Sequence, residues 1–78
     1  MNRKILEIIN DWNPVEIYPL LNDEYQEECK KISKEISVSD SVDYIAEVIY
    51  KIFKYSFGKE FTNSIEDCRE VAKKILHE

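Results

Sequence analysis

Apolar side chains recur every three or four residues along most of this chain, which is the spacing of one face of an α-helix. Four separate stretches show this spacing, and they predict helices over about residues 2–11, 23–36, 40–57 and 63–77. Only one glycine and two prolines occur in 78 residues, so little interrupts the helices. The pattern therefore predicts an all-α fold, a compact bundle of four helices with short connections.

The buried face of each helix is predicted from its apolar positions. In the first helix these positions are Ile5, Ile8, Ile9 and Trp12, with Trp12 as a core anchor at the helix end. In the second helix they are Tyr25, Cys29, Ile32 and Ile36. In the fourth helix they are Ile65, Cys68, Ala72, Ile75 and Leu76.

The third predicted helix has an unusually wide apolar face. Its main face consists of Val42, Ile45, Ile49, Ile52, Phe53 and Ser56, and its flank of Tyr44, Val48 and Tyr55. What remains is a narrow polar strip made of Asp43, Glu47, Lys51 and Lys54. A helix with so wide an apolar face is either central in the monomer or shared with a partner.

The residues between the helices carry start and stop signals. Asn13, Pro14 and Glu16 have the order of an N-cap, a first-turn proline and an N3 acid, so a short helical turn is expected near residues 14–18. Gly58 follows the third periodic stretch and predicts a helix stop in the left-handed conformation. Phe61 closes that corner.

Two further helix starts are marked by capping residues. Ser39, Asp40 and Ser41 are three candidate N-caps for the third helix. Asn63 and Glu66 have the spacing of a capping box for the fourth.

Composition is that of an ordinary globular domain, with 44% hydrophobic and 35% charged residues. Residues 1–78 are therefore expected to form a single helical domain. No apolar run of about 18 residues occurs and the N-terminus meets acidic residues early, so the expected location is the cytoplasm. Cys29 and Cys68 both fall on apolar faces and are expected to be reduced core thiols, with a disulfide or a redox or metal role as alternatives.

The net charge of −5 opposes binding to nucleic acid or any phosphate backbone. The most acidic stretch runs from Glu16 to Glu28. It could be a solvated helix start that complements the helix dipole. It could also bind a basic protein partner, and the candidate contact residues are then Glu16, Tyr18, Asp23, Glu24, Tyr25, Glu27 and Glu28.

Residues for catalysis are scarce. His77 is the only histidine and lies at the C-terminus, and the two cysteines fall on core faces, so no catalytic site, metal site or cofactor is expected. The string Asp40-Ser41-Val42 is superficially similar to the attachment site of acyl carrier proteins, where leucine follows the serine. The alternative interpretation of Ser41 is a helix-capping residue.

Three strings together resemble a known family: Ile8-Ile9-Asn10-Asp11-Trp12-Asn13-Pro14, then Asp23-Glu24-Tyr25, then Ile52-Phe53-Lys54-Tyr55-Ser56-Phe57-Gly58 before the closing helix. The chain is similar over nearly its whole length to the YugE-like family of small proteins of Gram-positive bacteria. That family typically has Trp-Asp-Pro where this chain has Trp12-Asn13-Pro14. The resemblance implies an all-α cytoplasmic domain and carries no assigned function or catalytic residues.

The sequence leaves several functions open. A non-enzymatic protein-binding module is favoured, on the grounds of the acidic stretch and its tyrosines. A structural homo-oligomer, such as a homodimer, or an accessory subunit is the alternative, because of the wide apolar face of the third helix. A carrier protein and a protein that neutralises a basic toxin are further alternatives. No membrane partner is expected.

Overall fold

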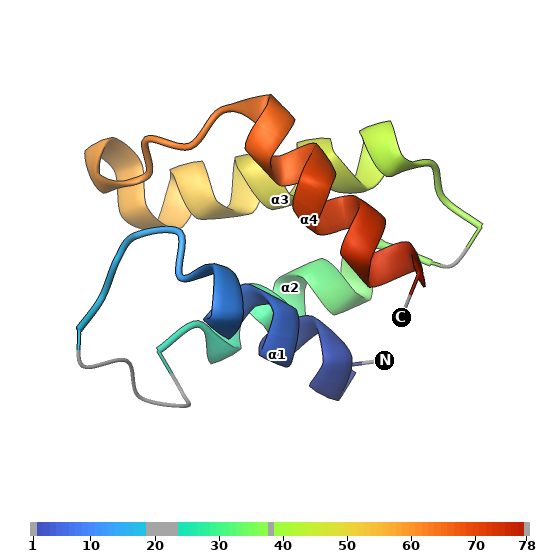
Figure 1. Cartoon of the computed structure of the whole chain (residues 1–78), viewed down its shortest axis with the longest axis horizontal. Helices are drawn as coiled ribbons and strands as arrows, with labels where there is room; N and C mark the ends of the chain where they lie inside the picture. Colours follow the sequence, from blue (N-terminus) through green and yellow to red (C-terminus); the bar gives the residue numbers. More distant parts are fainter. Residues whose placement is uncertain (1, 19–23, 38, 78) are drawn as a thin grey trace.

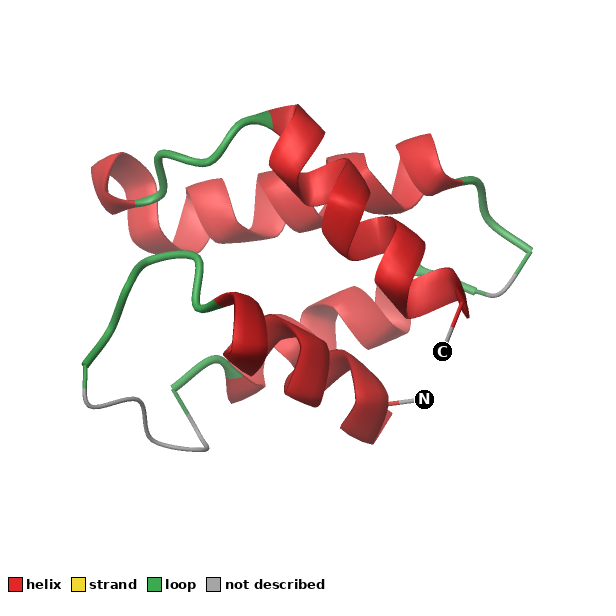
Figure 2. Ribbon diagram, viewed as in Figure 1, coloured by secondary structure: helices red, strands yellow, loops and turns green. Residues whose placement is uncertain are grey.

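The computed structural model describes residues 2–18, 24–37 and 39–77, which consist of helices and loops without a strand (Figure 2). The all-α fold predicted from the apolar spacing is thus confirmed for this part of the chain. The elements are α1 (Asn2–Trp12), α2 (Gln26–Glu35), α3 (Val42–Phe57), the 3-10 helix η1 (Gly58–Glu60) and α4 (Ile65–His77).

The helices form a closed arrangement in which each one packs on two neighbours (Figure 1). α1 lies beside α2, and α3 packs along α4 in the most extensive contact of the fold. Contacts of α2 with α3 and of α1 with α4 join the two pairs. None of the described helices is both long enough and apolar enough to cross a membrane. One side of α3 is exposed and faces away from the other helices.

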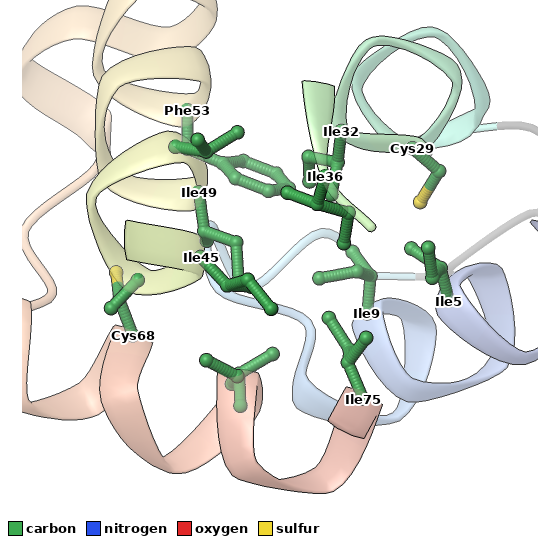
Figure 3. Packing of buried hydrophobic residues seen from close by; sticks show 14 of the residues in the cluster. Ile5, Ile9, Cys29, Ile32, Ile36, Ile45, Ile49, Phe53, Cys68 and Ile75 are labelled. Atoms are coloured by element: carbon green, nitrogen blue, oxygen red, sulfur yellow. The ribbon is translucent and has the colours of Figure 1, made fainter. Parts of the chain in front are cut away.

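Apolar side chains from all four α-helices meet in one core (Figure 3). Five isoleucines of the predicted faces are completely buried: Ile5, Ile9, Ile32, Ile45 and Ile49. Burying such a side chain contributes about 1.5–3 kcal/mol, so each of these residues adds substantially to stability. Two residues that were predicted to lie on buried faces are exposed instead: Ser56, and Ile65, which is 39% exposed.

Aromatic rings pack against one another within this core. Phe53 is at the centre of these rings, with ring centroids of four other rings 5.6–5.9 Å away. Those rings belong to Trp12, Tyr25, Phe57 and Phe61. Trp12 is the core anchor expected at the end of the first helix, and Phe61 is buried at the corner after α3, also as expected.

Asn13 organises the connection after α1. Its backbone has φ +46°, a conformation that asparagine tolerates better than most residues. The side-chain Oδ1 accepts from the Ile17 amide at 3.1 Å, and Nδ2 donates to the Ile17 carbonyl at 3.0 Å. The short turn expected near residues 14–18 is therefore present only as one hydrogen-bonded turn, in which the Glu16 amide donates to the Asn13 carbonyl at 3.0 Å, and not as helix.

The helix starts confirm one capping prediction and correct another. Ser41 is the N-cap of α3, since its Oγ accepts from the Tyr44 amide at 3.1 Å. The capping box of α4 is one residue later than predicted and pairs Ser64 with Asp67. Asn63 instead donates from Nδ2 to the Pro14 carbonyl at 2.9 Å and links the start of α4 to the connection after α1.

Gly58 ends α3 with a positive φ of 55°, as predicted, but its ψ is −121°. This differs from the left-handed helical conformation predicted from the sequence. It matches the first central position of a type II′ turn, which is a glycine position. The Gly58 amide still donates to the Lys54 carbonyl, so the helix closes and the chain turns at the same residue.

Candidate interaction surface

The residues of the acidic stretch have different exposures in the structure. Glu16 and Glu27 are exposed, Tyr18 is 79% exposed and Glu24 is half-buried. Tyr25 is completely buried and Glu28 only 8% exposed, and Asp23 lies outside the described residues. Fewer side chains of this stretch are therefore accessible to a partner than the seven predicted from the sequence.

Tyr25 serves the fold. Its hydroxyl donates to Asn13 Oδ1 at 2.6 Å and accepts from the Val15 amide at 3.2 Å. Burial raises the pKa of Tyr25 above its ordinary value, against the opposing effect of the Val15 hydrogen bond. A buried, hydrogen-bonded phenol at the start of α2 fixes the α1–α2 connection and is not accessible to a partner.

Cys29 and Cys68 are both buried and free, as the apolar spacing predicted. Desolvation raises the pKa of each thiol to about 12, and the nearby carboxylates of Glu28 and Asp67 add to the shift. The thiolate is the reactive form of cysteine, so these thiols are chemically inert near neutral pH.

The remaining candidates for chemistry are isolated. His77 is exposed at the end of α4. In the part of the chain that the structure describes, no three histidine, cysteine or carboxylate side chains come close enough to hold a metal ion. The Ser41 hydroxyl is exposed and engaged as the cap of α3.

Two grooves lie on either side of the polar strip of α3, which consists of Asp43, Glu47, Lys51 and Lys54. The α2–α3 groove has a volume of about 540 Å³, and the α3–α4 groove about 630 Å³. Glu47 and Lys51 line both grooves, so the strip separates them. All four residues of the strip are exposed, which agrees with the polar strip predicted from the sequence.

Both grooves combine apolar and charged lining. The α2–α3 groove is lined by Tyr44, Val48 and Ile52 from α3 and by Lys31 and Lys34 from α2. The α3–α4 groove is lined by Tyr50 from α3 and by Ile65 and Arg69 from α4. These lining residues come from three helices, which is why the spacing along one helix did not reveal the grooves.

Three of the four described large hydrophobic residues with high exposure gather along this face: Tyr44 (42%), Tyr55 (87%) and Ile65 (39%). The fourth is Tyr18, in the connection after α1. Lys31 Nζ lies 5.7 Å from the centroid of the Tyr55 ring, so a cation–π contact extends the surface from α2 to the end of α3. We call the polar strip, its two grooves and Tyr55 the α3 surface.

Charge on the polar strip is only partly neutralised within the chain. Arg69 Nε lies 3.1 Å from the Asp43 carboxylate, and Arg69 also pairs with Glu66 on its own helix. Two further ion pairs join Lys30 to Glu27 and Lys73 to Glu70. Glu47, Lys51 and Lys54 are in none of these pairs, so their charges remain available.

Comparison with known proteins identifies a family and no function. Residues 4–77 match the model of a family described as a domain of unknown function, DUF1871, and thus nearly the whole chain is covered. No curated protein and no solved structure matches the chain. The expectation of a small helical domain of unknown function agrees with this match.

Proposed function

We propose that this chain, which belongs to the DUF1871 family, is a non-enzymatic protein-binding module of the cytoplasm. The observation that carries the proposal is that exposed Tyr44 and Ile65 line two charged grooves on the α3 surface, with exposed Tyr55 beside Lys31 of the α2–α3 groove. Contiguous exposed apolar side chains with a polar rim are typical of interaction sites. A small rigid bundle presents them at a fixed spacing.

The side chains of the α3 surface suit binding better than catalysis. Tyrosine contributes contact area at a small entropic cost, because only two side-chain torsions are fixed. Lys31, Lys34 and Lys51 stand beside apolar lining in the α2–α3 groove, where they can fix the register of a partner. Two buried, unreactive thiols fit a reducing compartment, which supports the cytoplasmic assignment.

The acidic stretch is the second candidate surface. Tyr18 is 79% exposed, and Glu16 beside it is exposed too, so a basic partner could bind there. The α3 surface takes precedence because it joins three helices, whereas Tyr25 and Glu28 of the acidic stretch are buried.

Photo-crosslinking distinguishes the two surfaces. A photoreactive phenylalanine replaces Tyr55 in one variant and Tyr18 in the other, a matched pair because both tyrosines are highly exposed. On irradiation in the source cells, we expect discrete protein adducts from position 55. Adducts from position 18 alone would assign binding to the acidic stretch. Absence of adducts at both positions would contradict a protein-binding function.

The finer family assignment belongs to the same proposal. We propose that the family is the YugE-like one of Gram-positive bacteria, on the resemblance of the Trp12-Asn13-Pro14 and Phe57-Gly58 regions.

The carrier alternative is tested by intact-mass spectrometry after expression in bacteria, where we expect an unmodified Ser41. A covalently modified Ser41 would support a carrier instead.

A further inference from the structure

We infer that the occupant of the α3 surface is a second copy of this chain, packed antiparallel through α3 about a two-fold axis. The inference rests on the proposed protein-binding function and names its partner. In such a pair the same surface is used twice, so that if residue i faces residue j, residue j also faces residue i.

The order of charges along the polar strip is complementary to itself. Asp43 and Glu47 occupy the N-terminal half of the strip, and Lys51 and Lys54 the C-terminal half. When a second copy runs in the opposite direction with the axis level with Ile49, Glu47 of each copy lies opposite Lys51 of the other. Each dimer then contains two such pairs, formed from side chains that have no ion pair within the described chain.

The same register also places an aromatic ring beside a charge. Lys54 of one copy comes level with Tyr44 of the other, where an ammonium group can lie on the face of the ring. Asp43 and Tyr55 also come level, but they lie on opposite sides of the strip, Asp43 beside Arg69 of α4 and Tyr55 beside Lys31 of α2. The grooves on both sides of the strip can then receive the long side chains of the partner helix.

Partners of one charge fit this surface less well. An acidic segment would meet Asp43 and Glu47, and a basic segment would meet Lys51 and Lys54, so either one faces like charges over half of the strip. A partner needs the opposite order of charges over the length of α3. The antiparallel copy supplies that order without a second protein.

The available area predicts a weak, reversible dimer. The 16 residues of α3 span about 24 Å. Packed helix axes lie about 8–10 Å apart, so a face from α2 across α3 to α4 is about 20 Å wide and offers roughly 500 Å² on each copy. Two copies together bury about 1,000 Å², which lies at the small end of specific interfaces. Association is therefore expected only at high protein concentration.

Charge reversal provides a direct test by sedimentation velocity. The samples are the wild type, Glu47→Lys, Lys51→Glu, the double variant with both exchanges, and an equimolar mixture of the two single variants. In each single variant like charges meet at both pairs, whereas opposite charges meet again in the double variant and in the mixture. Glu27→Lys on α2 is the matched control, because Glu27 is equally a solvent-exposed helical carboxylate and lies outside the α3 surface.

We expect the wild type and Glu27→Lys to approach twice the 9.3 kDa mass of the chain at about 0.5 mM, a concentration suited to a weak interface. Each single variant should remain monomeric, and the mixture and the double variant should recover dimers. Thermal melting followed by circular dichroism verifies that every variant is folded.

Three results would overturn the inference: a monomeric wild type at that concentration, dimers that neither single exchange weakens, or a mixture that fails to recover association. A monomeric wild type together with crosslinks from position 55 to another protein would leave the proposed function standing and reject only the second copy. Absence of both dimers and crosslinks would reject the two proposals together.

Discussion

At the residue scale, Asn13 joins the segment after α1 to the start of α2 through one side chain. Its Oδ1 accepts from Tyr25 and Ile17, and its Nδ2 donates to the Ile17 carbonyl. The residue is 8% exposed and has φ +46°, so few residue types can replace it. A polar side chain therefore holds residues 13–17 to the start of α2.

We predict that Asn13→Ala lowers the free energy of unfolding by about 3 kcal/mol, because it strands the Tyr25 hydroxyl and strains a positive φ. Tyr25→Phe should cost about 1–2 kcal/mol. In the double variant the two costs should not add, with a coupling of about 1 kcal/mol measured by urea denaturation. Tyr18→Phe, at an exposed tyrosine, is the control and should be neutral. Additive effects of Asn13 and Tyr25 would show that their hydrogen bond contributes nothing.

Substitution of Gly58 measures the cost of its positive φ alone, because a side chain there would meet no steric crowding. A Cβ added there would meet no atom within 4 Å, so any cost of a side chain comes from the backbone angles. Gly58→Val should therefore cost about 1 kcal/mol or more and lower the melting temperature by about 4–8 °C. Lys59→Ala, at the exposed neighbouring position, should melt like the wild type. Equal melting temperatures for Gly58→Val and the wild type would exclude the positive φ.

The two buried thiols give the fold a dependence on alkaline pH. Their pKa is about 12 in the folded chain, against an ordinary value of 9.0. Between these values the unfolded chain releases thiol protons that the folded chain retains, so rising pH favours unfolding. This loss of stability is absent below about pH 9 and grows as the pH rises toward 12.

We predict a loss of stability between pH 9 and pH 11 that is smaller in the variant with Cys29→Ala and Cys68→Ala. The two proteins differ only at these two positions, so the difference between their pH profiles isolates the thiols. Urea denaturation at each pH measures it. Parallel profiles for the two proteins would show that the thiols do not stay protonated in the folded chain.

At the element scale, the capping box of α4 combines two reciprocal hydrogen bonds. The Ser64 amide donates to Asp67 Oδ2 at 3.1 Å, and the Asp67 amide donates to Ser64 Oγ at 3.2 Å. We predict that Ser64→Ala costs about 1 kcal/mol in unfolding free energy. Thr62→Ala, at a nearby exposed position outside the box, is the control. If Ser64→Ala were as stable as that control, the box would be dispensable.

The apolar spacing predicted all four helices and most of the core, because burial of one face follows directly from the periodicity of a helix. Helix ends were less predictable. α2 begins at Gln26, three residues after the expected start, since Glu24 and Tyr25 are in a turn. Asn63 had the sequence spacing of a cap, but its side chain is used by a contact with Pro14, 49 residues away. Such long-range contacts have no signal in local sequence.

The candidate site was predictable in part. Spacing along the third helix identified the polar strip of Asp43, Glu47, Lys51 and Lys54, and the structure shows all four exposed. The grooves beside the strip are also lined by residues of α2 and α4, and local spacing does not predict where those helices pack against α3. Conversely, Tyr25 fitted both a buried face and an acidic surface, and only the packing of its ring on Phe53 and Phe57 decides between them.

At the scale of the whole molecule, α3 has two roles. Its inner face supplies Ile45, Ile49 and Phe53 to the core, and its outer face separates the two grooves. The wide apolar face noted in the sequence is largely used inside the monomer. What remains outside is a charged strip flanked by tyrosines, which is the basis of the proposed pairing.

The pairing of two copies through α3 is tested most directly by ¹H–¹⁵N correlation spectra of the chain recorded over a dilution series. Antiparallel pairing predicts that amide shifts change with concentration along residues 43–55 of α3 and that those of α1 stay constant. Shifts that do not depend on concentration, or that change mainly in α1 or around Tyr18, would contradict it.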